Sequence, residues 1–513
     1  MRRVGASLTF LESPLVGGEI TLSDRRNRLI LFIVWLALVG WLLSVHTFWR
    51  DEVRAFSFAL SGANIPEMLR NVHGEGHPAL WYLILRAAHD LFPYREVLPV
   101  AGAVIGIAAG AVVAFRSPFR TVMVGLILFS FYGAYEYVVV ARNYGIAALV
   151  MFALATLYPR IRNSLWLGVI LAILCNTNVP GCLLAAMFLL FRFVEMLTDG
   201  SKPARREWLI FAGNALLSLI GALLCFCMIY PTFNDAALSA NYGFSIGRIF
   251  GGLVDPNSGF TNLGMGVILL ALSCLGLIGR PAALVAALAG LIVLKLFFFL
   301  IYPSSYRHEA LFLAFLISLY WVSANGAGGT WRGRPSLDLV QRAGTLVFVA
   351  LLALQIVPLY LPIKNAFIGK PFSRSADAAR VLQQPTLKNA IVMADPDTML
   401  EPIPYYADNP LWFLREQRFG KVARLTNNAR RVLTLDDILA DAERLHRQTG
   451  RPVVFMSHLE LTPNTRLRQA MMYNDETVVT PESAKHFFGS TRLVARLRPS
   501  GTDEDYDLYL YPR

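Results

Sequence analysis

Charge is scarce in this 513-residue chain: only 16% of its residues are Asp, Glu, Lys or Arg, while 55% are hydrophobic. Soluble globular chains carry about 25% charged residues. This deficit excludes an ordinary water-soluble enzyme, and the hydrophobic content excludes intrinsic disorder. The deficit is also uneven, because residues 1–362 hold 43 charged residues (12%) and residues 363–513 hold 39 (26%). The first part has membrane composition and the second has soluble composition.

Cysteine is scarce too, with five residues that all lie in the apolar part. That leaves no disulfide framework and no zinc-ligand spacing. The chain also lacks a P-loop and a dinucleotide-binding fingerprint. Its net charge of +12 sits in short basic clusters between apolar runs. Such clusters are typical of membrane topology, whereas nucleic-acid binding needs a basic face or stripe. We therefore expect no nucleic-acid partner.

Eleven apolar runs are candidates for membrane-spanning helices, which need roughly 20 predominantly apolar residues. The segment 77–92 is different, because its apolar run is short and contains Arg86 and His89, so we expect an interfacial helix there. The eleven runs are about 29–48, 97–115, 120–135, 143–158, 165–178, 180–194, 208–231, 264–279, 281–302, 309–324 and 344–362.

The basic residues also predict the topology. With these eleven spans, the loops on one side hold 17 Lys and Arg residues and those on the other side hold 8. Because cytoplasmic loops are enriched in Lys and Arg, the first side is cytoplasmic. The prediction is a cytoplasmic segment 1–28, a transmembrane domain 29–362 and an outer domain 363–513. The outer side then has two long loops, 48–96 and 232–263.

The soluble part alternates short β-rich runs with a helical stretch, which predicts a small α/β domain. The last two runs are expected to pair antiparallel across Ser500–Asp505. Asp395-Pro396-Asp397 matches the Asp-x-Asp pattern of metal sites in soluble sugar transferases, but we expect a turn, which Asp and Pro favour after a strand. The runs are 389–395, 451–458, 493–499 and 506–512, and the helical stretch is 436–448.

Polar residues expected at the outer membrane face form a candidate active site. Two acids follow the first span, and the other members stand where later segments enter the membrane from outside. Arginine forks suit phosphate oxygens, and a carboxylate suits removal of a proton from a hydroxyl. The two acids alone favour capping of the next helix, but the whole set predicts transfer of a group from a lipid phosphate to an alcohol. Its members are Asp51, Glu52, His77, Tyr82, Arg142, Tyr144, Arg307 and His308.

The order of these motifs resembles that of the GT-C membrane glycosyltransferases, in the group of the protein O-mannosyltransferases and aminoarabinose transferases. The motifs are W-x-D-E (49–52), H-P-x-L-x-Y (77–82), A-R-x-Y (141–144) and a late Y-R (306–307). The resemblance covers about residues 29–362. It implies a GT-C fold in a bacterial inner membrane, an outward-facing site, a polyprenyl-phosphate-linked sugar donor, inversion at the anomeric carbon, and a lipid, glycan or protein acceptor.

The resemblance also implies roles for individual residues. Asp51 occupies the position of the catalytic base and Glu52 that of its neighbour, while Arg142 and Arg307 would hold the lipid phosphate. His77, Tyr82, Tyr144 and His308 would contact substrate. Relatives often have a glutamate where this chain has Val140, and Glu136, four residues earlier, is the substitute candidate. A requirement for a divalent metal therefore stays open, with Glu136 as a candidate ligand.

Three interpretations of Lys295 stay open, since it lies within an apolar run about seven residues below the outer face. It meets the donor phosphate, extends to the membrane surface, or pairs with Glu309. Two other functions also stay open. A transporter of lipid-linked sugars should concentrate polar groups near the membrane midplane, whereas this chain places them at the outer rim. An inactive GT-C-like scaffold remains because the second family glutamate is absent.

Overall fold

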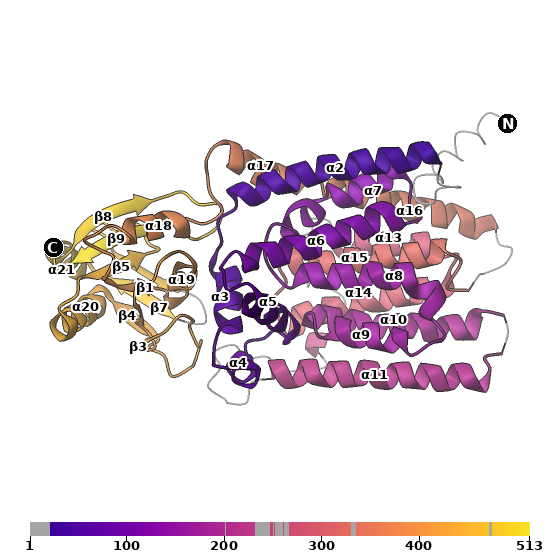
Figure 1. Ribbon diagram of the computed structural model, residues 1–513, viewed down its shortest axis with the longest axis horizontal. Helices are drawn as coiled ribbons and strands as arrows, with labels where there is room; N and C mark the ends of the chain where they lie inside the picture. The colour runs from indigo at the N-terminus through magenta and orange to yellow at the C-terminus, as the bar shows by residue number, and fades with distance from the viewer. Residues whose placement is uncertain are drawn as a thin grey trace.

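The computed structural model describes residues 21–200, 202–230, 247–249, 251, 260, 266–329, 335–470 and 475–513. A bundle of helices is followed by a sheet-containing C-terminal domain at one end of the bundle (Figure 1). Helix α2 (Leu22–Val45) begins at the opposite end. It starts within the expected tail 1–28, of which residues 1–20 lie outside the described residues. Of the expected loop 232–263, only residues 247–249, 251 and 260 are described.

In the described residues, seven helical segments are long and apolar enough to cross a membrane, so the chain is a polytopic membrane protein, but the expected count of eleven is not confirmed. They are α2, α6 (Val97–Arg116), α8 (Tyr144–Ile161), α10 (Val179–Thr198), α11 (Arg205–Ile229), α14 (Pro281–Leu300) and the segment Leu337–Phe367, formed by α16 (Pro335–Leu354), η4 (Val357–Leu359) and α17 (Tyr360–Phe367).

The other expected spans form shorter or more polar helices. The run 120–135 gives only α7, because the chain turns at Phe129 and then forms a π-helical turn, η1. The helix α15 is 19 residues long but has Arg307, His308 and Glu309 in its first turn. These elements are α7 (Thr121–Leu128), η1 (Tyr132–Glu136), α9 (Trp166–Cys175), α13 (Gly266–Cys274) with η3 (Leu275–Leu277), and α15 (Tyr306–Ala324).

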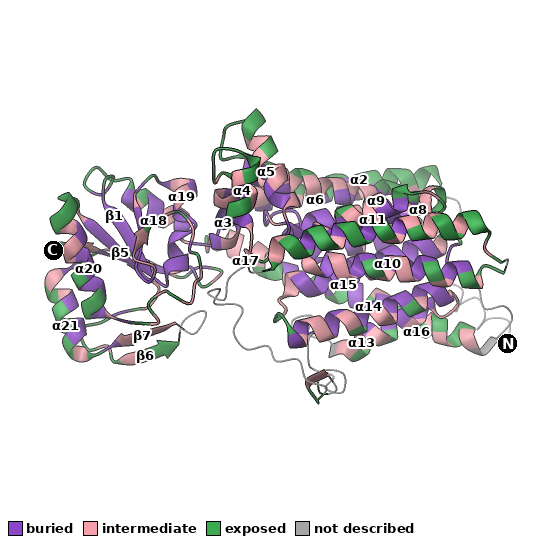
Figure 2. Cartoon of the chain, turned by 90° about the horizontal axis from the view of Figure 1, so that it is seen from below, coloured by how far each residue is buried: buried purple, intermediate pink, exposed green. Residues whose placement is uncertain are grey.

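Burial differs sharply between helices of the bundle (Figure 2). All residues from His308 to Ser323 of α15 are buried, so this helix forms the centre of the core. By contrast, α11 exposes large apolar side chains, including Leu216, Leu219 and Leu223. Apolar surface of this kind is stable in contact with lipid tails but costs free energy in water, so the exposure fits a membrane-facing helix.

Two glycines position the turn between η1 and α8. A Cβ atom at Gly106 of α6 or at Gly145 of α8 would lie 2.6 Å from the carbonyl oxygen of Tyr137. Real Cβ atoms do not approach an oxygen so closely, so only glycine lets α6 and α8 close on this turn. Residues 137–143 are thereby held against both helices, and the turn carries Arg142.

Three short helices form a layer between the bundle and the C-terminal domain (Figure 1): α3 (Arg50–Ala59), α4 (Ile65–Val72) and α5 (Leu80–Leu91). Their apolar faces pack together in one cluster that includes Phe56, Met68 and Trp81, with Tyr405 of the C-terminal domain. The helix α5 has 12 residues and is therefore too short to span a bilayer. It corresponds to the segment 77–92, expected to be interfacial.

The C-terminal domain is built on a six-stranded sheet of order β3-β2-β1-β5-β9-β8. Strand β1 is parallel to β2 and β5, and the remaining pairs are antiparallel, including the expected pair β8–β9. The strands are β1 (Ile391–Asp395), β2 (Leu411–Phe413), β3 (Arg418–Phe419), β5 (Val453–Ser457), β8 (Arg492–Leu497) and β9 (Tyr506–Tyr511). A second sheet has the order β4 (Val432–Thr434), β7 (Glu476–Val479), β6 (Leu467–Ala470).

Helices cover both faces of the larger sheet, which confirms the expected α/β domain. Val392 and Ala394 of β1 pack in a cluster with α18 (Ser375–Leu382) and α19 (Ile403–Tyr406). Ile391 and Met393 pack in the opposite cluster with α20 (Leu435–Thr449) and α21 (Pro481–Ser490). Alternate residues of a strand point to opposite faces, so a strand covered on both sides is buried throughout, as β1 is.

Candidate active site

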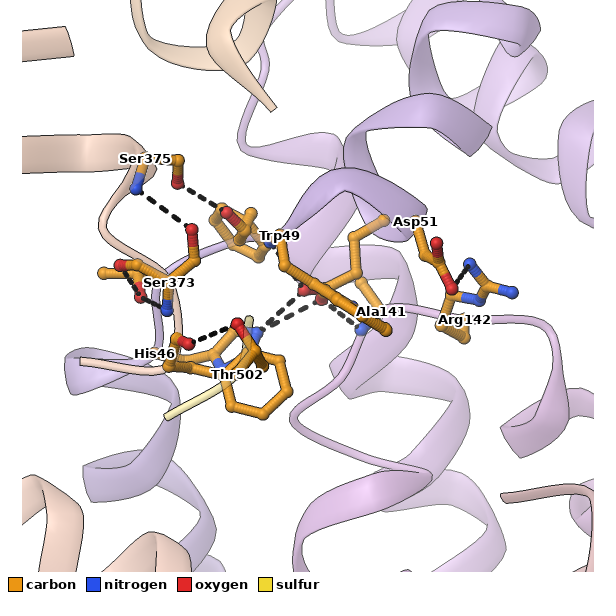
Figure 3. Close-up of polar contacts among 12 residues, drawn as sticks. His46, Trp49, Asp51, Ala141, Arg142, Ser373, Ser375 and Thr502 are labelled. Carbon is orange, nitrogen blue, oxygen red and sulfur yellow. Dashed lines mark hydrogen bonds and ion pairs between the residues drawn. The ribbon is translucent and has the colours of Figure 1, made fainter. Parts of the chain in front are cut away.

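The candidate base, Asp51, lies in the first turn of α3, directly after the N-cap residue Trp49 and Arg50. Its carboxylate faces two arginines from different elements. The Oδ2 atom lies 3.0 Å from Nη1 of Arg142 (Figure 3). It lies 3.6 Å from Nη1 of Arg307. The Asp51 side chain remains 30% exposed, so it is accessible to a ligand. The structure thus brings together the acid and both arginines that the sequence placed at the outer face.

These arginines control the charge of the acid. Burial on its own raises the pKa of Asp51, but attraction to Arg142, Arg307 and Arg50 outweighs burial and lowers the pKa to about 2. Asp51 is therefore an anion at every physiological pH. The guanidinium of Arg307 also lies 4.9 Å from the centre of the Trp49 ring, a cation–π contact that orients it.

Glu52, expected to act beside Asp51, has a different environment from its neighbour. Its side chain is fully buried. The Oε1 atom accepts the backbone N–H of Ala141 at 2.7 Å, Oε2 accepts that of Trp49 at 3.3 Å, and His46 Nε2 lies 3.0 Å from Oε2. Through these bonds the Glu52 carboxylate joins α3 to the turn 137–143. It does not face Arg142 and Arg307, the two arginines that lie beside Asp51.

His77 lies beside the arginine pair, with Nε2 at 3.5 Å from Nη2 of Arg142. Burial and repulsion from Arg142 lower the pKa of His77 to about 3, so the imidazole is neutral. Tyr82, one turn into the following helix α5, is buried and packs edge-on against Phe58. Of these two candidates for substrate contact, it is therefore His77 that contacts the arginine pair, through Arg142.

Tyr144 and His308 contact each other, with the Tyr144 hydroxyl 2.7 Å from His308 Nε2. The Nδ1 atom of His308 accepts the backbone N–H of Ser305 at 2.9 Å. This bond places the proton of a neutral imidazole on Nε2, which donates to Tyr144. Both residues are buried; His308 directly follows Arg307, and Tyr144 lies two residues after Arg142. They join the first turn of α8 to that of α15 and so support the arginine pair from below.

Lys295 is buried at 4% exposure in α14, inside the bundle. This burial argues against extension of its ammonium group to the membrane surface. Glu309, its other candidate partner, is fully buried in α15 and accepts a hydrogen bond from Ser304 at 2.6 Å. Glu136 ends the turn η1. Among the described residues no group of three or more His, Cys, Asp or Glu side chains could hold a metal ion.

The Asp-Pro-Asp sequence after β1 forms a turn, as expected. The buried Arg415 binds both acids. Its Nη2 atom lies 2.8 Å from Oδ1 of Asp395, and its backbone N–H donates to Oδ2 of Asp397 at 3.0 Å. These side chains therefore support the domain's own structure.

No sequence pattern indicated a second set of ion pairs, which the arginines of α3 form. Arg50 binds Asp503 of the C-terminal domain with both terminal nitrogens, at 2.9 and 2.8 Å. Arg54 binds Glu75, in the segment between α4 and α5, at 2.6 and 2.5 Å and also contacts Glu401 of the C-terminal domain. Arg50 and Asp503 lie 453 residues apart in the chain, and no local pattern predicts such a pairing.

A cavity of about 1460 Å³ lies between α3 and α4 on one side and residues 418–428 of the C-terminal domain on the other, beside the end of α11. Five basic residues line it and one acid, Glu75. Arg54 is neutralised by Glu75, and Arg418 by Glu416. The other three basic residues form no ion pair with a described residue, and they are Arg70, Lys421 and Arg424.

No family model matches the chain, and no curated protein matches it in sequence. Two solved structures are similar to it, both of ArnT from Cupriavidus metallidurans, one bound to undecaprenyl phosphate and one in the apo state. Each comparison covers 94% of this chain and 97% of the other, with a TM-score of 0.49 and sequence identities of 13% and 14%.

Proposed function

We propose that this protein is a membrane glycosyltransferase of the GT-C type, which moves a sugar from a polyprenyl-phosphate-linked donor to an acceptor hydroxyl at the outer membrane face. The observation that carries the proposal is the accessible Asp51 carboxylate held between Arg142 and Arg307 at the end of the bundle. One anion and two cations in contact are the groups needed to deprotonate an alcohol and to stabilise a departing phosphate.

In the proposed reaction, Asp51 takes the proton of the acceptor hydroxyl as the acceptor oxygen attacks the anomeric carbon. The bond between that carbon and the phosphate oxygen breaks, and polyprenyl phosphate leaves with the negative charge. Arg142 and Arg307 stabilise this charge, because guanidinium groups bind phosphate oxygens through paired N–H donors. A single displacement inverts the anomeric carbon and needs only one base, so Glu52 is free for its structural contacts.

The two arginines also explain how a carboxylate with a pKa of about 2 serves as a base. In the free protein they bind Asp51, which makes it a weak base. A donor phosphate competes for the same guanidinium groups and leaves Asp51 less neutralised. Donor binding thus raises the pKa of Asp51 toward the range where proton removal is efficient.

We place the acceptor in the basic cavity, which shares α3 with Asp51. Val53 and Arg54, on the next turn of that helix, line the cavity wall. Arg70, Lys421 and Arg424, which form no ion pair within the described chain, favour an acceptor that carries negative charge.

We place the N-terminus in the cytoplasm and the C-terminal domain outside, in a bacterial inner membrane. The excess of basic residues in one set of loops supports this orientation. The start of α2 and the C-terminal domain also lie at opposite ends of the bundle (Figure 1). A membrane-impermeant thiol reagent applied to intact cells should label Lys485→Cys and not Lys202→Cys, and the reverse pattern contradicts the orientation.

The function is tested by sugar transfer from an undecaprenyl-phosphate-linked sugar to a membrane extract, with release of undecaprenyl phosphate measured in detergent. Asp51→Asn keeps the shape of the side chain and removes the proton acceptor, so turnover should fall about 100- to 10,000-fold. Asp90→Asn is the matched control, since Asp90 is exposed on α5 and, within the described part of the chain, pairs only with Arg86. A wild-type rate in Asp51→Asn contradicts the assignment. Transport of the intact lipid-linked sugar without cleavage supports a transporter instead. Absence of any activity in both the wild type and Asp51→Asn supports an inactive scaffold.

A further inference from the structure

The first turn of α3 is capped by the C-terminal domain. A helix leaves its first four backbone N–H groups without partners inside the helix. At the start of α3, the N–H of Arg50 donates to Oε1 of Glu504 at 2.8 Å. Glu504 is fully buried, and its other oxygen accepts the hydroxyl of Ser373 at 2.5 Å. The acid that caps this helix therefore comes from the turn between β8 and β9, more than 450 positions away in the chain.

The residues just before α3 are bound to the same part of the protein (Figure 3). Thr47 and Ser373 exchange two hydrogen bonds of 2.8 Å, and Ser375 donates to the carbonyl of Phe48 at 2.7 Å. The N–H of Phe48 donates to the hydroxyl of Tyr406 at 2.9 Å. Two consecutive residues, Thr47 and Phe48, and the first residue of α3 are thus held by the C-terminal domain.

We propose that Glu504 is a positioning residue for the reaction: by holding the backbone of Arg50, it fixes the direction in which the next residue, Asp51, presents its carboxylate. The inference rests on the proposed function of Asp51 as the base. Asp51 itself touches no residue of the C-terminal domain by a hydrogen bond or ion pair in the described structure, so the backbone of α3 transmits the effect. The C-terminal domain thereby helps to orient the Asp51 carboxylate.

Asp503 offers a matched control. It binds the guanidinium of Arg50 at the surface, with its own side chain 49% exposed, but it makes no bond to the Arg50 backbone. Exposed ion pairs contribute little to stability. A variant at Asp503 therefore removes this ion pair of Arg50, and it leaves intact both the 3.5 Å ion pair of Arg50 with Glu504 and the backbone hydrogen bond of α3.

The experiment compares Glu504→Ala, Glu504→Gln and Asp503→Ala in the full-length protein, with kcat, donor KM and undecaprenyl phosphate affinity measured for each. A shift of about 1 Å in a catalytic group costs roughly 100-fold in rate. We expect kcat of Glu504→Ala to fall about 10- to 100-fold, while donor KM and undecaprenyl phosphate affinity change less than about threefold. Glu504→Gln should recover most of kcat, because its amide oxygen still accepts the Arg50 N–H. Asp503→Ala should resemble wild type.

The proposal is wrong if kcat of Glu504→Ala equals that of wild type, or if Asp503→Ala or Glu504→Gln loses as much. Should Glu504→Ala fail to fold, Ser373→Ala removes the other partner of Glu504 and should lower kcat severalfold at constant donor KM; an unchanged kcat overturns the proposal. Failure of the proposed function is recognised separately, because Asp51→Asn would then transfer sugar at the wild-type rate whatever the Glu504 variants do.

Discussion

The carboxylate of Glu52 accepts the backbone N–H of Ala141 at 2.7 Å. Each partner of this bond is next in sequence to a residue of the candidate site: Glu52 follows Asp51, and Ala141 precedes Arg142. The bond therefore sets the spacing between the acid and its arginine without touching either. It is buried, so no water replaces it when it is lost.

Replacing Glu52 should accordingly damage stability as well as rate. Glu52→Ala leaves the N–H groups of Ala141 and Trp49 without an acceptor, at a cost of about 1–3 kcal/mol for each buried group. We expect a lower melting temperature in a thermal unfolding assay, together with reduced turnover. Glu67→Ala, at a half-buried acid of α4, is the control. In the double variant Asp51→Asn, Glu52→Gln, the second change should reduce the amount of folded protein. It should not slow sugar transfer per folded molecule below the rate of Asp51→Asn alone.

The competition between donor phosphate and Asp51 for the arginines predicts a difference between two pH profiles. The acid limb of kcat/KM reports the base in the free protein, and that of kcat reports it in the donor complex. Because a bound phosphate draws Arg142 and Arg307 away from Asp51, the acid limb of kcat should lie at higher pH. Coincident limbs contradict this coupling.

Arg142→Gln gives an internal check on that difference. The variant removes the cation 3.0 Å from Asp51, so the two acid limbs should approach each other. Undecaprenyl phosphate should also bind about tenfold more weakly or worse, since a hydrogen bond to a charged group contributes roughly 1.5–3 kcal/mol. Arg160→Gln, at the exposed opposite end of α8, should change neither property.

The basic cavity predicts a charge-dependent acceptor affinity. Lys421→Glu and Arg424→Glu reverse charge on the cavity wall, so acceptor KM should rise about tenfold while donor KM is unchanged. Added salt should weaken acceptor binding to the wild type and reduce the difference between wild type and variants. Lys485→Glu is the control, because Lys485 is exposed on α21 and does not line the cavity. Equal acceptor KM in all these proteins argues against the placement of the acceptor.

The contact between α3 and the C-terminal domain should weaken as the pH rises. Burial raises the pKa of both Glu401 and Glu504 to about 7, above the ordinary value of 4.5. A carboxyl group with a raised pKa in the folded state stabilises it fully below about pH 4.5, and this contribution is lost as the pH rises through 7. We expect the melting temperature to fall by several degrees between pH 5.5 and pH 8.

Variants of Glu401 and Glu504 test whether these two groups cause the pH dependence of the melting temperature. Glu401→Gln and Glu504→Gln should each flatten the dependence of melting temperature on pH, because the amide does not titrate. Glu443→Gln, at an exposed position of α20, should leave the slope as it is in wild type. An identical slope in all three variants shows that other groups cause it.

Local patterns in the sequence predicted the outer acid, both arginines and the α/β domain, because apolar periodicity and charge clusters record which side of a membrane a residue faces. They did not predict the role of Glu52, since adjacency to Asp51 says nothing about the direction of a side chain on a helix. They also missed Glu504 and Glu401, which meet α3 only after the whole chain has folded. The expected count of eleven spans is not confirmed in the described residues, where apolar runs such as 120–135 are interrupted by turns.

Tyr137, held between Gly106 and Gly145 through its carbonyl oxygen, also donates its hydroxyl to the carbonyl of Arg307 at 2.7 Å. One residue thus anchors the turn of Arg142 and the helix of Arg307 together. The backbone positions of the two arginines are consequently set by the fold and not by whatever ligand arrives. Under the proposed function, a lipid headgroup has to fit side chains that start from these fixed points, and an alanine at position 145 would move those points while leaving both arginines in the sequence.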